Sequence, residues 1–364
     1  MLFMDNLRFS RRNFLSAVGV TGAATITNLA PLHSFANIRE NEKHSAPDRV
    51  IKMISTVNLS DKEQEKIRSV SKNVELQIVD NNRAISDDAE VMIGDVDGAT
   101  LQRLKKLKWV QVWHAGVENI PKEMIAHPVV LTNMQKVLAP VIAESAIALL
   151  LSLTRGLTQT SIPNFQNKKW AGVPDDVILD DLYHKTIAIV GMGGIGSETA
   201  RRLHYGFNMR VIATDAKPMH KPDFVDELHD PSWLLDMVPQ ADVLMSAAPL
   251  TNLTKEMFNS EVFGKMKRDA YFINVSRGGL VQQSALISAL KNKKIRGAGL
   301  DVTTPEPLPA DHELWTCPNL VITPHNSSVA DVRDQRMLAL AVENVRRYTL
   351  GMPLMNVVDK EKGY

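Results

Sequence analysis

Cysteine is nearly absent from this chain of 364 residues, in which Cys317 stands alone. A single thiol cannot close an internal disulfide, and no Cys-x-x-Cys pair or Cys/His cluster is present to hold a structural zinc ion. Long blocks of like charge are also missing, although the chain carries 42 basic and 41 acidic residues. This pattern disfavours a nucleic-acid partner and an acidic tail. We therefore expect small-molecule partners, no nucleic acid and no metal.

The composition is that of a globular protein. Hydrophobic residues make up 44% of the chain and charged residues 23%, so enough apolar side chains are available for a full core. At roughly 150 residues per domain, the length predicts about two to two and a half domains. No internal repeat with a solenoid period is visible.

The amino terminus differs from the rest. Residues 1–36 contain three arginines and no lysine, followed by an apolar stretch that ends on Ser34-Phe35-Ala36. This order is typical of a signal peptide, and residues 10–15, SRRNFL, resemble the twin-arginine export motif. We expect cleavage after Ala36, a polar linker at residues 37–48, and export to the periplasm through the twin-arginine machinery. If the signal does not function, the protein is cytoplasmic.

A second apolar stretch, residues 137–157, contains Glu144. A charge near the centre of a membrane-spanning helix costs about 2.5–3.5 kcal/mol on insertion scales. We therefore expect a helix buried between two domains.

Short apolar runs alternate with helix-like segments from residue 49 onward, which indicates βαβ units and parallel sheets. The predicted strands form a first series at residues 50–54, 74–79, 91–94, 109–113 and 129–132, and a second series of six at residues 186–190, 210–214, 243–247, 271–275, 297–300 and 320–323. A helix is expected near the carboxyl terminus, at residues 329–348.

The first strand of the second series leads directly into the sequence GMGGIG. Gly191 allows a tight turn, Gly193 lets the backbone approach a pyrophosphate, and Gly196 allows close packing of the following helix on the strand. Gly194 and Ile195 complete this loop, and the helix that starts here offers N–H groups to the phosphates. The pattern predicts a dinucleotide site.

Asp215 indicates which dinucleotide is bound. It lies twenty-four residues after Gly191, at the end of the next predicted strand, where a carboxylate accepts from ribose hydroxyls and repels a 2′-phosphate. NAD is therefore favoured over NADP. Lys217 weakens this preference, since a nearby lysine tolerates a phosphate.

Three ionisable side chains follow neighbouring strands of the second series. Arg277 comes after the fourth strand, Glu306 lies in the loop after the fifth, and His325 follows the sixth. Ligands bind at the carboxyl ends of strands in such sheets. A carboxylate beside an imidazole favours the imidazolium and fixes its tautomer, and an arginine fork binds a carboxylate through two bonds.

The chain resembles the D-isomer-specific 2-hydroxyacid dehydrogenases, through motifs spread over residues 50–358. These are LTN at 131–133, AE at 143–144, the loop that begins at Gly191, APLT-x-x-T at 248–254, NVSRG at 274–278, LDV at 300–302, EPL at 306–308 and TPH at 323–325. The resemblance implies that Arg277 holds and polarises a 2-oxo acid, that Glu306 orients the histidine, and that His325 is the acid and base.

The resemblance also implies further contacts. Segment 109–120 is similar to the loop whose backbone N–H groups bind the substrate carboxylate, which would be Ala115, Gly116 and Val117 here. Trp113 or His114 would narrow this pocket toward small acids such as glyoxylate or hydroxypyruvate, or would instead pack at the strand end. The remaining expected cofactor contacts are Ala248, Pro249, Thr254, Val275, Ser276, Arg277, Asp301, His325 and Ser327.

The expected fold is α/β, with a Rossmann doubly wound NAD-binding domain at residues 143–327 inserted into a flavodoxin-like substrate domain at residues 49–142 and 328–358. The resemblance implies a homodimer. Two alternatives remain open at this stage: a formate or phosphite dehydrogenase of the same architecture, and a non-catalytic NAD-binding sensor or scaffold. Outside the cytoplasm the enzyme would also need a tightly held NAD or a redox partner.

Overall fold

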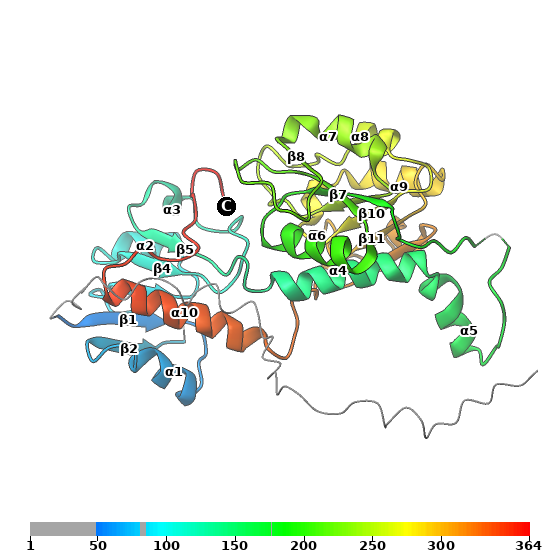
Figure 1. Cartoon of the computed structure of the whole chain (residues 1–364). Coiled ribbons are helices and arrows are strands. Elements are labelled where there is room, and N and C mark those ends of the chain that lie inside the picture. Colours follow the sequence, from blue (N-terminus) through cyan, green and yellow to red (C-terminus); the bar gives the residue numbers. More distant parts are fainter. Residues whose placement is uncertain (1–48, 81–84, 176) are drawn as a thin grey trace, which may run out of the picture. The chain divides into compact units, whose positions relative to one another are not determined.

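The computed structural model describes residues 49–80, 85–175 and 177–364, all within one compact unit, Ser45–Tyr364. The predicted signal peptide and linker lie outside the described residues. Two parallel sheets form the framework (Figure 1).

The first sheet has five strands in the order β2-β1-β3-β4-β5, which is the flavodoxin-like order. Its strands are β1 (Ile51–Ser55), β2 (Val74–Ile78), β3 (Val91–Ile93), β4 (Trp109–Gln111) and β5 (Val130–Thr132), and the helices that follow them are α1 (Asp61–Arg68), α2 (Gly98–Arg103) and α3 (Glu123–Ala126). All five strands were predicted, to within one or two residues at their ends.

The chain returns to this sheet at its carboxyl end. Helix α10 (Arg333–Thr349) buries Leu338 and Val345 in the same apolar cluster as residues of β1 and β3. Farther along, Val357 pairs with Thr132 of β5 in an isolated antiparallel bridge. In Figure 1 the red-orange α10 lies beside the blue β1. The first sheet is therefore built from two parts of the chain that are far apart in sequence.

The second sheet has seven strands in the order β12-β11-β10-β9-β6-β7-β8, which is the Rossmann arrangement extended by one strand. Its strands are β6 (Thr186–Val190), β7 (Arg210–Thr214), β8 (Glu227–His229), β9 (Val243–Ser246), β10 (Tyr271–Asn274), β11 (Gly297–Leu300) and β12 (Leu320–Ile322). The prediction of six strands was wrong by one. Strand β8 escaped it because this short edge strand has a single apolar residue, Leu228.

Strand β6 shows why the second sheet needs helices on both faces. All five of its residues are buried, as expected for a central parallel strand. Ile187 and Ile189 belong to one apolar cluster, and Ala188 and Val190 to another. The helices of this part are α4 (Ala139–Thr154), α5 (Ile162–Gln166), α6 (Gly194–Phe207), α7 (Leu234–Met237), α8 (Ser260–Lys265) and α9 (Gln283–Lys291).

Helix α4 is the helix expected from the apolar stretch. It buries seven of its residues and packs against α6, β10 and β11, while Glu144 is exposed 3.8 Å from Arg202. Within the described ranges, no single helix has the length and apolarity to cross a membrane. Helix α4 passes that test only together with Leu157–Gln166, and the two are bent by 60° at the break between them.

Candidate active site

Three neighbouring strands of the second sheet, β10, β11 and β12, present the predicted groups at their carboxyl ends. Arg277 follows β10, Asp301 follows β11 directly, and His325 follows β12. Because the strands are parallel and adjacent, their carboxyl ends lie at one edge of the sheet.

His325 and Glu306 form the pair that the sequence predicts. Nδ1 of His325 lies 2.8 Å from Oε2 of Glu306, and the two side chains are 44% and 36% exposed. A carboxylate accepts only, so Nδ1 carries the proton of this bond. Nε2 of His325 meets no hydrogen-bond partner in the described part of the chain. It is therefore the ring nitrogen available to a substrate.

The backbone around His325 is held by Asp301. His325 has φ of +50°, a conformation uncommon for a residue with a side chain. Asp301 is 1% exposed, and its carboxylate accepts from the Thr323 hydroxyl at 2.6 Å and from the N–H groups of Asn326 and Ser327, both at 3.1 Å. A buried carboxylate with several donors fixes the turn that aims the imidazole. The sequence predicted Asp301 as a cofactor contact; the structure adds this supporting role.

The loop that carries Glu306 is tied down from two sides. The Thr303 N–H donates to Oε1 of Glu306 at 2.9 Å. Gln283, the first residue of α9, donates to the Thr304 carbonyl at 2.7 Å and accepts from the Thr304 N–H at 3.1 Å. The carboxylate of Glu306 is thereby anchored on one oxygen and leaves the other for His325.

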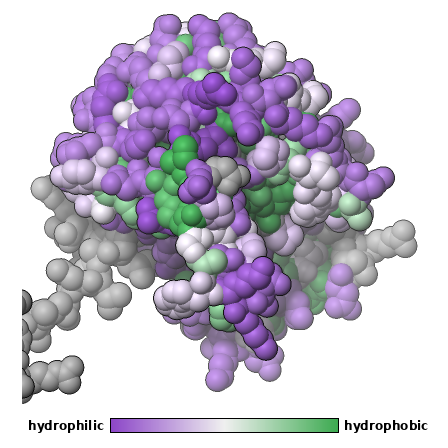
Figure 2. Space-filling model, turned by 90° about the vertical axis from the view of Figure 1, so that its right-hand side faces the viewer, coloured by the Kyte–Doolittle hydropathy of each residue, from purple (hydrophilic) through white to green (hydrophobic). Residues whose placement is uncertain are grey.

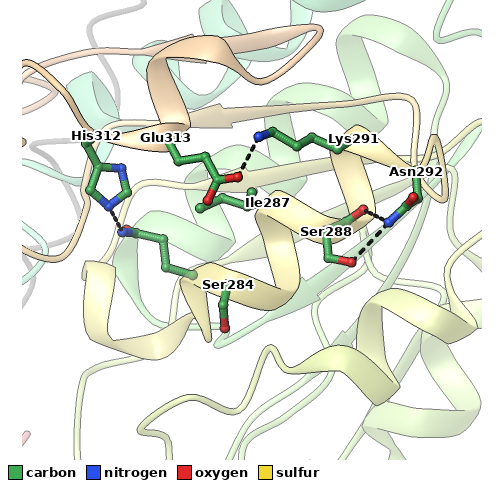
Figure 3. A pocket seen from close by; sticks show the side chains of 8 residues that line it. Ser284, Ile287, Ser288, Lys291, Asn292, His312 and Glu313 are labelled. Carbon is green, nitrogen blue, oxygen red and sulfur yellow. Dashed lines mark hydrogen bonds and ion pairs between the residues drawn. The ribbon is translucent and has the colours of Figure 1, made fainter.

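Gln283 also borders a surface pocket between α9 and the turn Glu313–Thr316 (Figure 3). His312, Lys291 and Glu313 line it, and Lys291 is paired with Glu313. The pocket includes none of the predicted catalytic residues. Within this lining Asn292 donates to the carbonyl and to the hydroxyl of Ser288.

Arg277 meets the predicted substrate loop. Its Nε donates to Oε1 of Glu118 at 2.5 Å, and its Nη1 donates to the Ser276 carbonyl at 2.7 Å. A Cβ added at Gly116 would lie 2.1 Å from Nη2 of Arg277 and 2.3 Å from Oε2 of Glu118. A larger residue here would require the ends of these two side chains to move. Burial works against ionisation of Glu118, but the charge and hydrogen bond of Arg277 hold the pKa of this carboxyl below its usual value.

A second histidine–carboxylate pair lies beside this loop. Nε2 of His114 is 2.8 Å from Oδ1 of Asp95, and Nδ1 is 2.5 Å from the Gly116 carbonyl. Trp113, the other residue expected to narrow the pocket, packs against the apolar clusters formed with α10. Packing at the strand end thus accounts for Trp113.

The glycine loop has the geometry that its sequence predicts. Gly191 has φ of +98°, and a Cβ there would lie 2.7 Å from the backbone of Ala247. A Cβ at Gly196 would lie 1.9 Å from the Gly191 carbonyl, whereas one at Gly193 would meet nothing within 4 Å. Helix α6 begins at Gly194 without a side-chain cap, so its first N–H groups are available to a phosphate.

Asp215 borders the same loop. It accepts from the Met192 N–H and from the Lys217 N–H, both at 2.7 Å. Lys217 directs its ammonium over the ring of Tyr364, 4.3 Å from the centroid. The Asp215 carboxylate, which would meet a ribose, is therefore held in place next to the glycine loop.

The other predicted cofactor contacts form the surrounding backbone. The Thr254 hydroxyl donates to the Pro249 carbonyl at 2.7 Å and closes the turn after Ala248. Ser276 donates from its hydroxyl to the Ser246 carbonyl at 3.1 Å. The Ser327 carbonyl accepts from Ser145 of α4 at 3.3 Å. Val275, Ser276 and Ser327 are buried.

Sequence reasoning missed Asp95, Gln283 and the pairing of Glu118. Asp95 follows β3 and His114 follows the neighbouring β4, so the argument from strand ends, applied to the first sheet as well, would have placed these two together. Gln283 carries no such signal, because its partners, the Thr304 backbone and the His312 ring, belong to a loop that is distant in sequence.

Taken together, a dinucleotide loop and an acid–base pair on one sheet edge define a nucleotide-dependent oxidoreductase. Residues 147–327 match the family described as D-isomer specific 2-hydroxyacid dehydrogenase, NAD binding domain. Over 279 residues the chain is 35% identical to glyoxylate/hydroxypyruvate reductase B of Escherichia coli O6:K15:H31, covering 75% of this chain and 85% of that protein. The chain therefore belongs to the D-isomer-specific 2-hydroxyacid dehydrogenase family and is a 2-hydroxyacid oxidoreductase.

Solved structures agree with this assignment. The TT0316 protein of Thermus thermophilus is 30% identical, with a TM-score of 0.69 over 85% of this chain and 100% of that one. An NADPH-dependent glyoxylate/hydroxypyruvate reductase of Sinorhizobium meliloti, in complex with citrate, is 25% identical, with a TM-score of 0.70 over 85% of this chain and 98% of that one.

Proposed function

We propose that the protein interconverts a small 2-oxo acid and the D-2-hydroxy acid with NAD(H), with glyoxylate and hydroxypyruvate as the favoured oxo acids. The observation that carries the proposal is His325: Nδ1 is held by Glu306 while Nε2 has no described partner. The name of the curated relative, a glyoxylate/hydroxypyruvate reductase, supports the substrate class.

His325 moves the proton. In reduction, Nε2–H donates to the carbonyl oxygen of the oxo acid, and the proton passes to that oxygen as the alcohol forms. Glu306 stabilises the imidazolium before the transfer and keeps the ring oriented during it. In oxidation the neutral Nε2 takes the proton back from the hydroxyl.

Arg277 and the loop at residues 115–117 hold the substrate carboxylate. The guanidinium supplies charge and two parallel donors, and the backbone of Ala115, Gly116 and Val117 supplies N–H groups. Gly116 allows close approach of the loop to Nη2 of Arg277. This arrangement would fix the oxo group in front of Nε2 of His325.

The glycine loop fits a dinucleotide, because the space over Gly193 is open and the start of α6 has no side-chain cap. Gly191, Gly193 and Gly196 would cradle the pyrophosphate, and Asp215 would accept from the ribose hydroxyls. When bound, the nicotinamide supplies the hydride that goes to the 2-oxo carbon.

The preference for NAD rests on Asp215, whose charge opposes a 2′-phosphate. Relatives include an NADPH-dependent reductase, so the preference needs a direct test. We expect kcat/KM to be higher with NADH than with NADPH, and Asp215→Ser to reduce the ratio about tenfold, equivalent to ~1.4 kcal/mol. Equal values for the two cofactors in the unaltered protein would remove the assignment.

A panel of acids tests the reaction. NADH oxidation is followed with glyoxylate, hydroxypyruvate and larger 2-oxo acids, and NAD reduction with formate and phosphite. Arg277→Ala should raise KM for 2-oxo acids by about a hundredfold, since a charged hydrogen bond to a carboxylate is lost. Turnover of formate or phosphite alone would favour the alternative dehydrogenases, and cofactor binding without any turnover would favour a sensor.

The proposed homodimer has a candidate surface in the segment around α5. Phe165 is 84% exposed and Trp170 is fully exposed. Figure 2 views this side of the molecule and shows hydrophobic side chains among hydrophilic ones. Exposed large apolar groups on a projecting segment suit a partner surface. Light scattering should give the mass of a dimer, and Trp170→Ser should weaken it.

Export remains a proposal for residues 1–36. The mass of the mature protein isolated from the cell envelope should correspond to a chain that starts at Asn37. A chain found in the cytoplasm with residue 1 intact would contradict export. NAD released from the purified envelope protein would support a tightly held cofactor.

A further inference from the structure

His114 faces two acceptors at once. Nε2 lies 2.8 Å from the Asp95 carboxylate and Nδ1 lies 2.5 Å from the Gly116 carbonyl. Neither oxygen has a proton to give, so both contacts are hydrogen bonds only when both ring nitrogens carry protons. The geometry therefore selects the imidazolium form of His114.

The Gly116 carbonyl belongs to the peptide unit that also carries the Val117 N–H. This unit is trans, since the cis peptides of the described residues are at Pro305 and Pro307. In a trans peptide the C=O and N–H bonds point in opposite directions. A bond that fixes the Gly116 carbonyl therefore also fixes the direction of the Val117 N–H, and a cationic donor on the carbonyl makes that N–H a stronger donor.

The N–H groups of residues 115–117 are available to a ligand. In the described chain, the backbone N–H groups of Ala115, Gly116 and Val117 donate to no other residue. The Ala115 carbonyl accepts from Asn133 at 2.7 Å, so the other side of the loop is anchored as well. Three successive N–H groups without a described acceptor, next to Nη2 of Arg277, are the kind of donors that bind an anion.

The charges around His114 favour its protonated form. Asp95 contributes most, through its hydrogen bond and charge, and the Gly116 carbonyl and Glu118 add to it, so that the pKa of His114 is raised although burial opposes the shift. Arg277, the cation that lies against Gly116, is paired with Glu118. The side chains of His114 and Asp95 are 42% and 74% exposed, so solvent screens part of their attraction.

We propose that the Asp95–His114 pair is a positioning device for substrate binding: protonated His114 holds the Gly116 carbonyl and aims the Val117 N–H at the substrate carboxylate. Affinity for 2-oxo acids then falls when His114 loses its proton, while the rate of the chemical step at His325 is unchanged. The inference rests on the proposed function of the loop at residues 115–117.

KM for the oxo acid should depend on the protonation of His114. A histidine whose pKa is raised in the folded protein is protonated below the ordinary value, near 6.5, and remains so until the pH passes its raised value. KM for the oxo acid should thus be low and constant in weakly acidic solution and should increase as the pH rises through the raised pKa. The contribution of the pair to folding stability is lost over the same interval.

Two substitutions separate the roles of the two ring nitrogens. The amide nitrogen of asparagine takes the place of Nδ1, so His114→Asn keeps a donor to Gly116 without titrating. His114→Leu removes the donor. We expect KM close to that of the unaltered protein and independent of pH in His114→Asn, and about five- to tenfold higher at weakly acidic pH in His114→Leu, the loss of one good hydrogen bond. In both variants kcat should remain unchanged.

Asp95→Asn and His184→Asn complete the series. Asp95→Asn keeps an acceptor for Nε2 but removes the charge, so the rise in KM should begin at lower pH. His184 is exposed, has φ of +58° and belongs to none of these contacts, so its replacement by asparagine should leave the pH profile of KM unchanged.

Titration of the imidazole C–H resonances in NADH-bound protein gives a readout that needs no turnover. The resonance missing from His114→Asn should titrate above the ordinary range of histidine, and oxamate, used as an unreactive 2-oxo acid analogue, should bind more weakly above that point. The inference is overturned if His114 titrates at or below the ordinary value. It is also overturned if the affinity for oxamate has the same pH profile in His114→Leu as in the unaltered protein. If no acid is turned over but the affinity for oxamate still depends on the protonation of His114, the proposed function is contradicted and the inference about His114 is not.

Discussion

The two histidine–carboxylate pairs differ in how many ring nitrogens of the histidine have a partner. In the pair at the second sheet, His325 uses one ring nitrogen on Glu306 and has the other without a described partner. In the pair at the first sheet, His114 uses both nitrogens, on Asp95 and on the Gly116 carbonyl. Exposure does not separate them, since the two imidazoles are 44% and 42% exposed.

This difference underlies the roles that we propose, a proton donor at His325 and a fixed cation at His114. A general acid needs a nitrogen that can reach the substrate and give up its proton. A ring with acceptors at both ends loses a hydrogen bond when it gives up a proton, so it holds its position and charge instead. In the roles that we propose, the same residue types serve chemistry on one sheet and orientation on the other.

The largest effect is expected from His325→Asn. Because the variant lacks a titrating nitrogen, kcat should fall by about 10²–10⁴-fold in either direction, with binding of NADH unchanged by fluorescence titration. His114→Asn is the matched control and should keep its kcat. A His325→Asn variant that retains most of its kcat would mean that the two histidines have been assigned the wrong roles.

Replacing Glu306 and Asp95 by their amides compares what each carboxylate contributes to the histidine that it contacts. Glu306→Gln removes the charge that stabilises the imidazolium of His325, and kcat should fall about tenfold, equivalent to ~1.4 kcal/mol, a value kept small because both side chains are partly solvated. Asp95→Asn should alter KM and leave kcat unchanged. Steady-state rates from about pH 5 to pH 9 measure both. Equal losses of kcat in the two variants would erase the distinction between the pairs.

The smallest effect is expected from Glu118→Gln. Glu118 lies against Nε of Arg277 at 2.5 Å and brings a negative charge to the proposed carboxylate site. Its removal should lower KM for 2-oxo acids by about threefold, less than 1 kcal/mol, because the pair is partly exposed.

The pH dependence of that change distinguishes Glu118 from His114. The lowered pKa of Glu118 keeps it ionised at neutral pH, so the decrease in KM should be uniform there. The stability that Glu118 gains from Arg277 is present above the pKa of an unfolded glutamate and is lost as the pH falls through the lowered value. An increase in KM would instead mean that Glu118 orients the guanidinium for the substrate.

Much of the framework could be predicted because local patterns are strong there. The strand TIAIV is followed at once by GMGGIG, and both the strand and the turn have the predicted bounds. Gly191 and Gly196 indicate backbone positions at which no side chain can be accommodated. Strand β8 could not be predicted, since an edge strand needs few apolar residues and this one is recognised only by its pairing with β7.

For the candidate site, the positions at strand ends could be predicted, but the contacts between loops could not. Arg277, Asp301 and His325 follow strands, and the order of strands in a parallel sheet brings them to one edge. The contacts of Asp301 with the His325 turn, of Gln283 with Thr304 and of Ser145 with Ser327 depend on loop paths that no local pattern encodes.

The sequence by itself determined the class of fold, the dinucleotide loop and the strand ends that Arg277 and His325 follow, because hydrophobic periodicity and glycine spacing act over a few residues. Tertiary structure alone decided which nitrogen of each histidine is engaged. Glu118 and Arg277 are separated by 159 residues, and only the packing of the chain brings such groups within hydrogen-bond distance.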